Sequence, residues 1–404
     1  MRILVSTTAG PGHFGPVVPF ARACLEAGHD VLVAAPRSFS DTVGSAGFTH
    51  APFDDVPEEV MGAVFGRLPG LPRHEANSIV LGEVFGRLDA QAALVGVSET
   101  VAAWAPDVIL REPCELASWA AAVAAGIPQV VVRIGIAAMD VEMTAAWLDP
   151  LDELRALAGI DPGAGPPPTQ GDLTLSLVPP AFDNGPAAGA PPGSPTVHRH
   201  RDGSPAAAAV LPDGMADSDA PLVYVTFGSV AGGLGPFAAI YPAVVEALAG
   251  RAEQVLLTCG KALDPASLEP LPRNVRAVSW WPQRDVLPAA AAVIGHGGFG
   301  TTLGALTAGV PQLVVPLFSS DQFLNAARVA ETGVGLRIGS GLDGVDDLPA
   351  ALDTLLGEPS YSDTAATMAA DAAALADVAA AVEVVEDLAG RGLSRRRGSR
   401  GAGR

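Results

Sequence analysis

A histidine in the first loop of the chain is placed to act as a general base. His13 lies in the segment 9–15, between a predicted buried strand at 2–8 and a helix at about 16–27. A neutral imidazole there can accept a proton from a hydroxyl, provided that a carboxylate orients it and stabilises its charged form. Glu112 directly follows another predicted strand of the same sheet, 107–110. We therefore predict a catalytic His13–Glu112 pair, although a charge at a helix N-terminus would also explain Glu112.

A glycine-rich loop in the second half of the chain is suited to bind phosphate. It follows a short apolar strand that begins at residue 292, and it opens a helix at Thr301. Glycines allow backbone N–H groups to approach a ligand closely, and the N-terminus of a helix favours negative charge. Because one helix terminus contributes only about 0.3–1 kcal/mol, several donors must converge. The predicted donors are Ser229, His296, Gly297, Gly298, Gly300 and Thr301.

Five more side chains follow predicted strands and are suited to bind a nucleoside or a sugar. Trp280 and Trp281 come after the strand 275–279, where an aromatic ring can stack on a flat base. Gln283 can donate to and accept from the edge of a base or a ribose. Asp321 and Gln322 follow the strand 311–317 and can bind sugar hydroxyls, or else cap the next helix. Since adjacent side chains point apart, we expect one of the two tryptophans to pack in the core.

The first loop also has the spacing of a dinucleotide-binding fingerprint. Gly10, Gly12 and Gly15 form G-x-G-x-x-G after a strand and before a helix. The second strand, 29–35, ends without an acidic residue for a ribose, but Arg37 keeps an NADP-binding oxidoreductase as an alternative. A P-loop pattern is absent, and neither His296 nor the cysteines have the spacing of metal ligands. We therefore expect no metal site.

Composition limits the kinds of binding partner and the cellular compartment that we expect for this protein. The formal net charge of −20 argues against a surface that binds nucleic acid. Three cysteines far apart in sequence, and an N-terminus that enters a strand without a signal-like segment, favour the cytoplasm. The longest apolar stretch, 117–138, is interrupted by glycine, proline and arginine and is not expected to span a membrane.

Strands and helices alternate in both halves of the chain, which predicts an α/β protein of two doubly wound domains. We expect an N-terminal domain at 1–205, a turn-rich linker at 206–220 and a C-terminal domain at 221–361. Within the first domain, 52–94 is predicted to be helical without strands, and 184–195 is a Pro/Gly-rich patch. An alanine-rich helix is expected at 362–388. The basic segment 389–404 has few apolar residues to bury and is predicted to be disordered.

These motifs resemble those of the family 1 nucleotide-sugar glycosyltransferases, and in particular the antibiotic and natural-product enzymes of actinomycetes. The matching segments are GPGHFGPVVPFARACLEAGHDV, VYVTFGS and GHGGFGTTLGALTAGVPQLVVPLFSSDQFLNAARVAETGVG, which together span both domains. The resemblance implies the GT-B fold, with two Rossmann-like domains that face each other across a cleft. It also implies that the helix at 362–388 crosses back to the N-terminal domain.

The resemblance assigns roles to residues that match the family's motifs. It implies that His13 is the general base and that Glu112 stands where the family usually has an aspartate. It places Trp280 against a uracil or thymine ring. It further implies diphosphate contacts from His296, Gly297, Gly298 and Thr301, and donor-sugar contacts from Asp321 and Gln322.

Together these features predict an inverting, metal-independent glycosyltransferase. It would move a sugar from a dTDP- or UDP-sugar to a hydroxyl of a hydrophobic natural product, with no other cofactor. The acceptor is expected in the N-terminal domain, between 52–94 and 139–147, and the sugar nucleotide in the C-terminal one. A monomer or homodimer without nucleic-acid or membrane partners is expected. The predicted acceptor contacts are Phe65, Phe85, Met139 and Trp147.

Three alternatives remain open. A sugar-nucleotide 2-epimerase shares the GT-B fold but needs no acceptor, so incubation with the sugar nucleotide alone distinguishes it. An oxidoreductase would respond to NADPH. A non-catalytic helper protein is expected to lack the base and the phosphate-binding loop, and both are present here.

Overall fold

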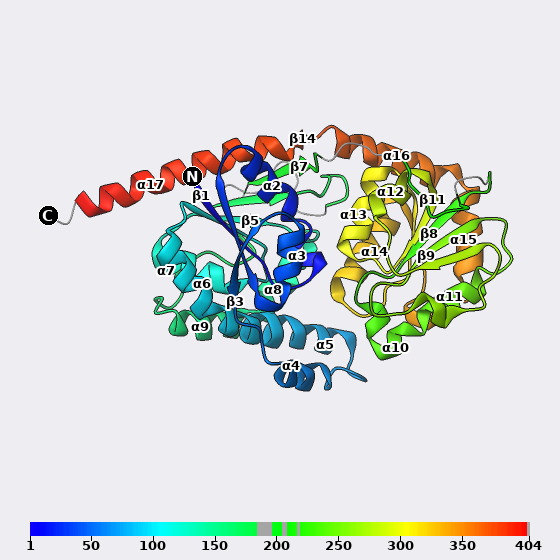
Figure 1. Cartoon of the computed structure of the whole chain (residues 1–404), viewed down its shortest axis with the longest axis horizontal. Coiled ribbons are helices and arrows are strands. Elements are labelled where there is room, and N and C mark those ends of the chain that lie inside the picture. Colours follow the sequence, from blue (N-terminus) through cyan, green and yellow to red (C-terminus); the bar gives the residue numbers. More distant parts are fainter. Residues whose placement is uncertain (184–195, 204–207, 216–218, 402–404) are drawn as a thin grey trace. The chain divides into compact units, whose positions relative to one another are not determined.

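The computed structural model describes residues 1–183, 196–203, 208–215 and 219–401. The predicted Pro/Gly-rich patch at 184–195 lies outside these residues. The chain divides into two compact units (Figure 1). Unit 1 comprises residues 1–177, 184–203 and 376–404, and unit 2 comprises residues 178–183 and 204–375.

Unit 1 is built on one parallel sheet with the strand order β14-β7-β6-β5-β4-β1-β2-β3. The central strands are short runs of apolar residues that are buried on both faces, as expected for a sheet covered by helices on both sides. Chain order reverses between β1 and β4, which makes this pair the switch point of the sheet. The strands are β1 (Arg2–Ser6), β2 (Asp30–Pro36), β3 (Thr49–Phe53), β4 (Val108–Arg111), β5 (Gln129–Val132), β6 (Leu173–Ser176), β7 (Val197–Arg201) and β14 (Ala376–Asp377).

Helices cover both faces of this sheet. They are α1 (Pro11–Phe14), α2 (Val18–Glu26), α3 (Ser40–Ser45), α4 (Glu58–Phe65), α5 (Arg73–Ile79), the π-helix η2 (Val80–Asp89), α6 (Ala90–Trp104), α7 (Leu116–Ala125), α8 (Ala138–Ala146), α9 (Leu148–Leu157) and α17 (Ala381–Gly401), with short 3-10 turns η1 (Arg37–Phe39) and η7 (Val378–Ala380). Buried residues of α6 and α7 pack on Leu4 and Ile109. On the other side, α17 packs against α2, β4 and β6.

Unit 2 repeats the same architecture. Its parallel sheet has the order β10-β9-β8-β11-β12-β13, so the switch point lies between β8 and β11. The strands are β8 (Leu222–Thr226), β9 (Gln254–Thr258), β10 (Val275–Val278), β11 (Ala290–Gly295), β12 (Gln312–Val314) and β13 (Gly335–Arg337). The helices are α10 (Gly235–Ala238), α11 (Ile240–Ala247), α12 (Gln283–Val286), α13 (Phe299–Ala308), α14 (Ser320–Thr332), α15 (Leu348–Gly357) and α16 (Pro359–Ala373), with 3-10 turns η3 (Ala231–Gly233), η4 (Pro265–Leu268), η5 (Leu287–Ala289) and η6 (Gly341–Gly344).

Alternating residues of the β8 strand show how the second sheet is packed. Val223 and Val225 belong to a buried cluster with α11 and α15. Leu222 and Tyr224 point the other way and belong to a cluster with α12 and α13. This period of two is the expected pattern for a strand between two helical layers. Both domains are thus Rossmann-like α/β folds, as the sequence predicts.

Four predicted segments differ from the structure. The expected helix at 362–388 is broken, because Ala376 and Asp377 pair with β7 and return the chain to unit 1. The helix α17 then continues to Gly401, so most of the segment predicted to be disordered is helical, in keeping with the high helix propensity of arginine. Residues 402–404 lie outside the described residues.

The predicted linker at 206–220 is also not a free connection. Its described part packs on unit 2, where Met215 is buried and the Val210 N–H donates to the Asp285 carbonyl at 2.8 Å. The region 52–94 begins with the last residues of β3, a strand that was not predicted. In both cases apolar side chains pack against residues that are distant in the sequence. Local sequence pattern does not predict such contacts.

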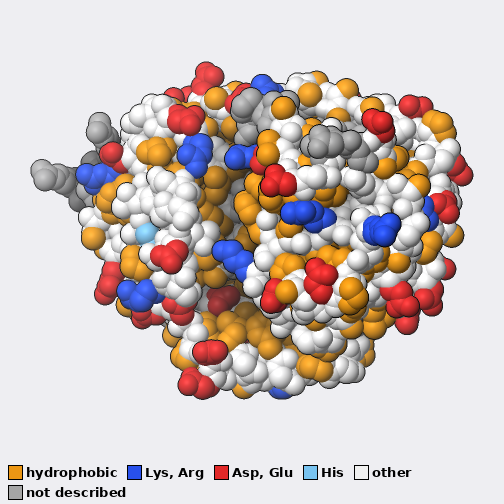
Figure 2. Space-filling view, turned by 45° about the vertical axis from the view of Figure 1, so that its right-hand side comes forward, with side chains coloured by type: hydrophobic (Ala, Val, Ile, Leu, Met, Phe, Trp, Pro, Cys, Tyr) orange, Lys and Arg blue, Asp and Glu red, His pale blue; other side chains and the backbone are white. Residues whose placement is uncertain are grey.

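Charged side chains of both signs lie on the face drawn in Figure 2. On the face drawn in Figure 2, acidic and basic side chains are interspersed and do not form a continuous basic stripe, in keeping with the net charge of −20. In the described part of the chain, every helix is too short or too polar to cross a bilayer.

Candidate active site

The switch point of unit 1 brings the predicted base and its carboxylate together. The strands β1 and β4 are hydrogen-bonded neighbours, so the loops that follow them leave the same edge of the sheet. The first loop leads into the short helix α1, which carries His13, and the second begins with Glu112. Gly10 permits this turn with a φ of 128°, a conformation that L side chains rarely adopt.

His13 and Glu112 are in direct contact. The His13 Nδ1 atom lies 3.3 Å from Glu112 Oε1, and the side chains are 21% and 0% exposed. Thr8 donates to the same oxygen from its backbone N–H at 3.2 Å and its hydroxyl at 3.0 Å. The Cys114 N–H donates to Glu112 Oε2 at 2.6 Å. The carboxylate is thus held by four groups, and its contact with Nδ1 orients the imidazole in turn.

Glu112 stays ionised despite its burial. Burial raises the pKa of its carboxyl, but the charge of His13 and the hydrogen bonds from His13, Cys114 and Thr8 outweigh this effect, so the pKa lies below its ordinary value. A carboxylate in this state stabilises the positive charge that a histidine acquires when it removes a proton. Thr8 was not predicted as part of the site, and only its position two residues after β1 could have suggested it.

The same place offers the one group of metal-ligand type found among the described residues. Ligand atoms of His13, Glu112 and Cys114 all lie within 4.8 Å of one another. Both oxygens of Glu112 already accept hydrogen bonds from Thr8 and Cys114. The geometry therefore suits a histidine–carboxylate pair that is completed by protein donors.

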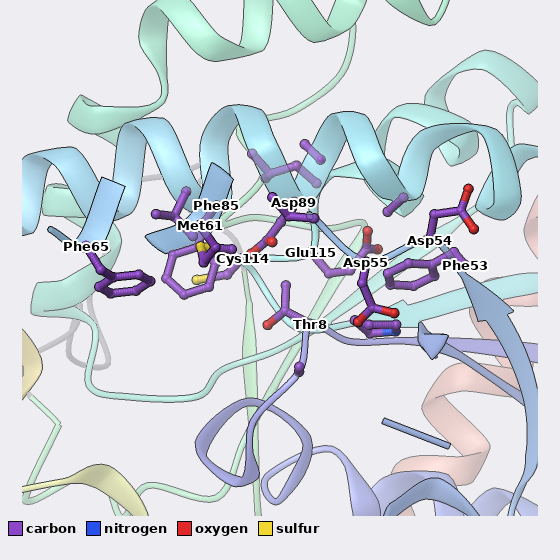
Figure 3. Close-up of a pocket in the computed structure, with 17 residues that line it drawn as sticks. Thr8, Phe53, Asp54, Asp55, Met61, Phe65, Phe85, Asp89, Cys114 and Glu115 are labelled. Carbon is purple, nitrogen blue, oxygen red and sulfur yellow. The ribbon is translucent and has the colours of Figure 1, made fainter. Parts of the chain in front are cut away.

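An apolar cavity lies beside His13. Its volume is about 270 Å³, and it is bounded by the loops after β1, β3 and β4 and by the helices α4, η2 and α6. Two of the predicted acceptor contacts, Phe65 and Phe85, line it (Figure 3). The rings of Phe85 and His13 have centroids 5.1 Å apart, which places the cavity next to His13. A cavity of this kind can hold an apolar small molecule.

The other two predicted acceptor contacts lie elsewhere. Trp147 is fully buried, and its indole N–H donates to the Leu81 carbonyl at 2.8 Å. Met139 packs against the same cluster and does not line the cavity. The prediction was wrong for Trp147 because its large ring fills the core between η2, α8 and α9. Asp89, which lines the cavity, was missed.

The switch point of unit 2 carries the glycine-rich loop. Gly297 has a φ of +85°, and an added Cβ atom would lie 2.6 Å from the Gln322 carbonyl oxygen. A Cβ on Gly298 would lie 2.6 Å from His296 Nε2, and one on Gly228 would lie 2.9 Å from His296 Cε1. The imidazole is therefore held between two glycines. The loop ends at the N-terminus of α13, whose first N–H groups have no partner within the helix.

The predicted phosphate donors surround this loop. Burial lowers the pKa of His296 to about 4, so the ring is neutral at pH 7 and acts as a hydrogen-bonding group. Thr301 is buried in the first turn of α13 and accepts a hydrogen bond from Gln283 Nε2 at 2.9 Å. Ser229 is exposed after β8, and Gly300 is exposed with open space around its Cα atom.

The two tryptophans have different environments. Trp280 is 64% exposed and offers a ring face to a ligand. Trp281 packs against the core of unit 2, and its indole N–H donates to the Val210 carbonyl at 2.7 Å. Of the pair, Trp280 is therefore the candidate for stacking on a base, and Trp281 supports the fold.

The acid–amide pair begins α14 in the structure. Asp321 is part-exposed in its first turn. Gln322 is buried, and its Oε1 accepts from the N–H groups of Leu317 and Phe318 at 2.8 and 3.1 Å. The side-chain carbonyl of Gln322 thus binds the backbone of the loop after β12 and is not available to a sugar. Asn325, which was not predicted, donates to the Gly297 carbonyl at 2.8 Å and connects α14 to the glycine-rich loop.

Each unit therefore has a site at the switch point of its own sheet. Unit 1 has a histidine–carboxylate pair beside an apolar cavity, and unit 2 has a helix N-terminus with neutral hydrogen-bonding groups. Two Rossmann-like domains, each with polar groups at the switch point of its sheet, are typical of enzymes of the GT-B class.

Comparison with known proteins agrees with this class. Residues 244–389 match the family described as erythromycin biosynthesis protein CIII-like, C-terminal domain. The chain is 31% identical over 363 residues to the L-demethylnoviosyl transferase of Streptomyces niveus, covering 89% of this chain and 90% of that one. It therefore belongs to the family of actinomycete antibiotic glycosyltransferases.

Solved structures support the same assignment. The glycosyltransferase VinC in complex with dTDP aligns with a TM-score of 0.77 at 25% identity, covering 97% of this chain and 100% of that one. The spinosyn rhamnosyltransferase SpnG complexed with spinosyn aglycone aligns with a TM-score of 0.76 at 25% identity, covering 96% and 100%. The fold is GT-B, and the protein is a glycosyltransferase of antibiotic type.

Proposed function

We propose that this enzyme transfers a sugar, with inversion, from a dTDP- or UDP-sugar to a hydroxyl of a hydrophobic natural product. The observation that carries the proposal is the contact between His13 and Glu112 at the edge of an apolar cavity. That cavity offers room for an aglycone beside a base. The relatives named above, which include a complex with dTDP and a complex with an aglycone, support the two substrate classes.

The proposed reaction begins with the acceptor. His13 removes the proton from its hydroxyl through Nε2, while Glu112 balances the charge that the ring acquires. The acceptor oxygen then forms a bond to the anomeric carbon as the bond from that carbon to the diphosphate oxygen breaks. Attack from the face opposite the diphosphate inverts the anomeric configuration.

The nucleoside diphosphate leaves with increased negative charge. The backbone N–H groups of Gly298 and the first turn of α13, together with His296 and Thr301, are the donors that we assign to it. Fixed neutral donors stabilise such a charge without reorganising during the reaction. Trp280 is assigned to the base of the nucleotide and Asp321 to the sugar. The sugar nucleotide is the only co-substrate in this scheme, and no metal is assigned to it.

A product assay tests the proposal directly. The protein is incubated with a dTDP- or UDP-sugar and a hydrophobic polyphenol in buffer containing EDTA, and products are analysed by mass spectrometry and NMR. We expect a glycoside of inverted anomeric configuration. A retained configuration would contradict direct displacement, and loss of activity in EDTA would contradict metal independence. Conversion of the sugar nucleotide without an acceptor would indicate an epimerase.

A thermal-shift screen identifies the donor class. A ligand at about 100 times its dissociation constant stabilises the folded state by roughly 2.7 kcal/mol. We expect dTDP or UDP to raise the melting temperature more than GDP or NADPH.

The enzyme is assigned to the cytoplasm, where its three buried free cysteines remain reduced.

A further inference from the structure

One carboxylate in the cavity of unit 1 takes no part in the His13–Glu112 pair. Asp89 is the last residue of the π-helix η2 and is partly buried. It lies one turn after Phe85 and one turn before Ala93, and all three line the cavity. Figure 3 shows Asp89 between Phe65 and Phe85 toward one end and Phe53 and Asp54 toward the other. Its side chain therefore faces the same space as the proposed acceptor.

The packing of η2 explains this orientation. A Cβ atom on Gly82 would lie 3.1 Å from the Ala146 carbonyl, and one on Gly86 would lie 3.0 Å from the Pro150 ring. These two glycines let η2 approach α8 and α9 closely. The opposite side of η2, with Val84, Phe85 and Asp89, is thereby turned to the cavity.

The other carboxylates around the cavity already have partners. Asp54 lies 3.1 Å from Arg37, and Asp55 accepts from the N–H and the hydroxyl of Ser38. Glu115 caps α7 by accepting two backbone N–H groups, each at 3.0 Å. For Asp89, the described residues supply no hydrogen bond and no salt bridge, so its oxygens are left for a ligand.

The cavity walls make an unpaired carboxylate costly. Most of the lining is apolar, and Lys and Arg are absent from it; the largest apolar residues are Phe53, Met61, Phe65, Phe85 and Leu116. Burial raises the pKa of Asp89 to about 7; the charge of His13 opposes this shift, whereas Glu112, Glu115 and Asp55 add to it. A cation that enters the cavity would remove this cost, because a paired charge is far cheaper to bury than a single one.

We propose that the cavity binds a hydrophobic acceptor that carries an amine, with its ammonium group paired to the Asp89 carboxylate and its reacting hydroxyl at His13. The inference rests on the proposed function, whose acceptor site it specifies. Phe85 lies between the two ends, 5.1 Å from the His13 ring, and gives an apolar wall for the scaffold that joins amine and hydroxyl. Asp89 acts here as a specificity residue.

Matched acceptors test this assignment. Two phenols are compared that share one aromatic scaffold, one bearing a dimethylaminomethyl group and the other an isobutyl group in its place. We expect kcat/KM of the wild type to favour the amine by about 10- to 100-fold, the range for a hydrogen bond to a charged group. In Asp89→Asn most of this preference should disappear, mainly because KM for the amine rises. The control is Asp152→Asn, which removes one charge from the surface of unit 1, where Asp152 pairs with Arg155 at 2.8 Å.

A binding measurement separates this inference from the proposed function. Calorimetry of the amine without a sugar nucleotide, in two buffers of different ionisation enthalpy, counts released protons. Since the pKa of Asp89 is about 7 before an amine binds, pairing at pH 7 should release about half a proton in the wild type and none in Asp89→Asn.

The outcomes are distinct. The assignment of Asp89 would be overturned if the wild type had the same kcat/KM for both phenols. It would also be overturned if Asp89→Asn lowered kcat/KM equally for both. If the amine binds with Asp89-dependent proton release but no glycoside forms from either phenol, the cation site stands and the proposed function fails.

Discussion

The charge of Glu112 is expected to account for a large part of the rate. In Glu112→Gln the side chain keeps its length but loses its charge, 3.3 Å from His13 Nδ1. Two unit charges at that distance interact by about 5 kcal/mol at an effective dielectric constant of about 20. This is an upper limit, because the His13 side chain is 21% exposed. With about 1.4 kcal/mol per factor of ten, a fall in kcat of about 10²- to 10³-fold is expected.

The hydrogen-bond pattern adds to the effect of the charge. The oxygens of Glu112 accept from Thr8 and from the Cys114 N–H, so one of these donors would face the new amide NH2 group. A buried donor left without an acceptor costs about 1–3 kcal/mol of stability. We therefore expect a lower melting temperature together with the lower kcat.

Steady-state transfer to a fixed acceptor, measured across pH, is the assay. The acidic limb of the kcat profile should move to lower pH in Glu112→Gln, since the carboxylate no longer stabilises the protonated imidazole. Glu112→Asp is the matched control: it keeps the charge and should retain more activity than Glu112→Gln. If Glu112→Gln is folded and turns over at the wild-type rate, His13 acts without this carboxylate and the pair is not catalytic.

Three further predictions concern other parts of the two sites. Trp280→Ala should weaken dTDP or UDP binding by about 0.5–1.5 kcal/mol in calorimetry, judged from the value of aromatic contacts, and an unchanged affinity would remove Trp280 from the nucleotide site. Gly297→Ala should lower the melting temperature and nucleotide affinity together, since the new Cβ atom would lie 2.6 Å from the Gln322 carbonyl; a normal melting temperature would contradict the tight approach. Asp89→Asn should stabilise the protein at pH 8 by up to about 4 kcal/mol, the cost of ionising a carboxyl whose pKa is raised from 3.8 to about 7. Because a raised pKa lowers stability only above the unfolded value, this gain should shrink as pH falls toward 4, and a pH-independent gain would refute the assigned cause.

The features that sequence predicts best are those set by local pattern. Apolar runs between glycine-rich turns predict the strands β1, β4, β8 and β11, and the order of parallel strands then places His13 near Glu112 and Ser229 near His296. The prediction of the His13–Glu112 pair required only the rule that ligands bind at the carboxyl ends of such strands.

Other features depend on packing that local pattern does not contain. The side of η2 on which Asp89 lies follows from the π-helical winding of that helix. Its wider turn changes which residues share a side. Trp147 was expected in the acceptor site as an apolar side chain of the segment 139–147, but it fills the core of unit 1. Gln322 was expected to bind sugar, but its carbonyl oxygen serves the backbone after β12.

The central claim is that His13 is the base that activates the acceptor. The most direct measurement is the turnover of His13→Ala, with the affinity for dTDP or UDP determined on the same preparation. Loss of a positioned base is expected to lower kcat by about 10²- to 10⁴-fold, while nucleotide affinity stays close to the wild-type value because the residues proposed to bind the nucleotide belong to unit 2. Near-normal turnover of a folded His13→Ala variant would contradict the account.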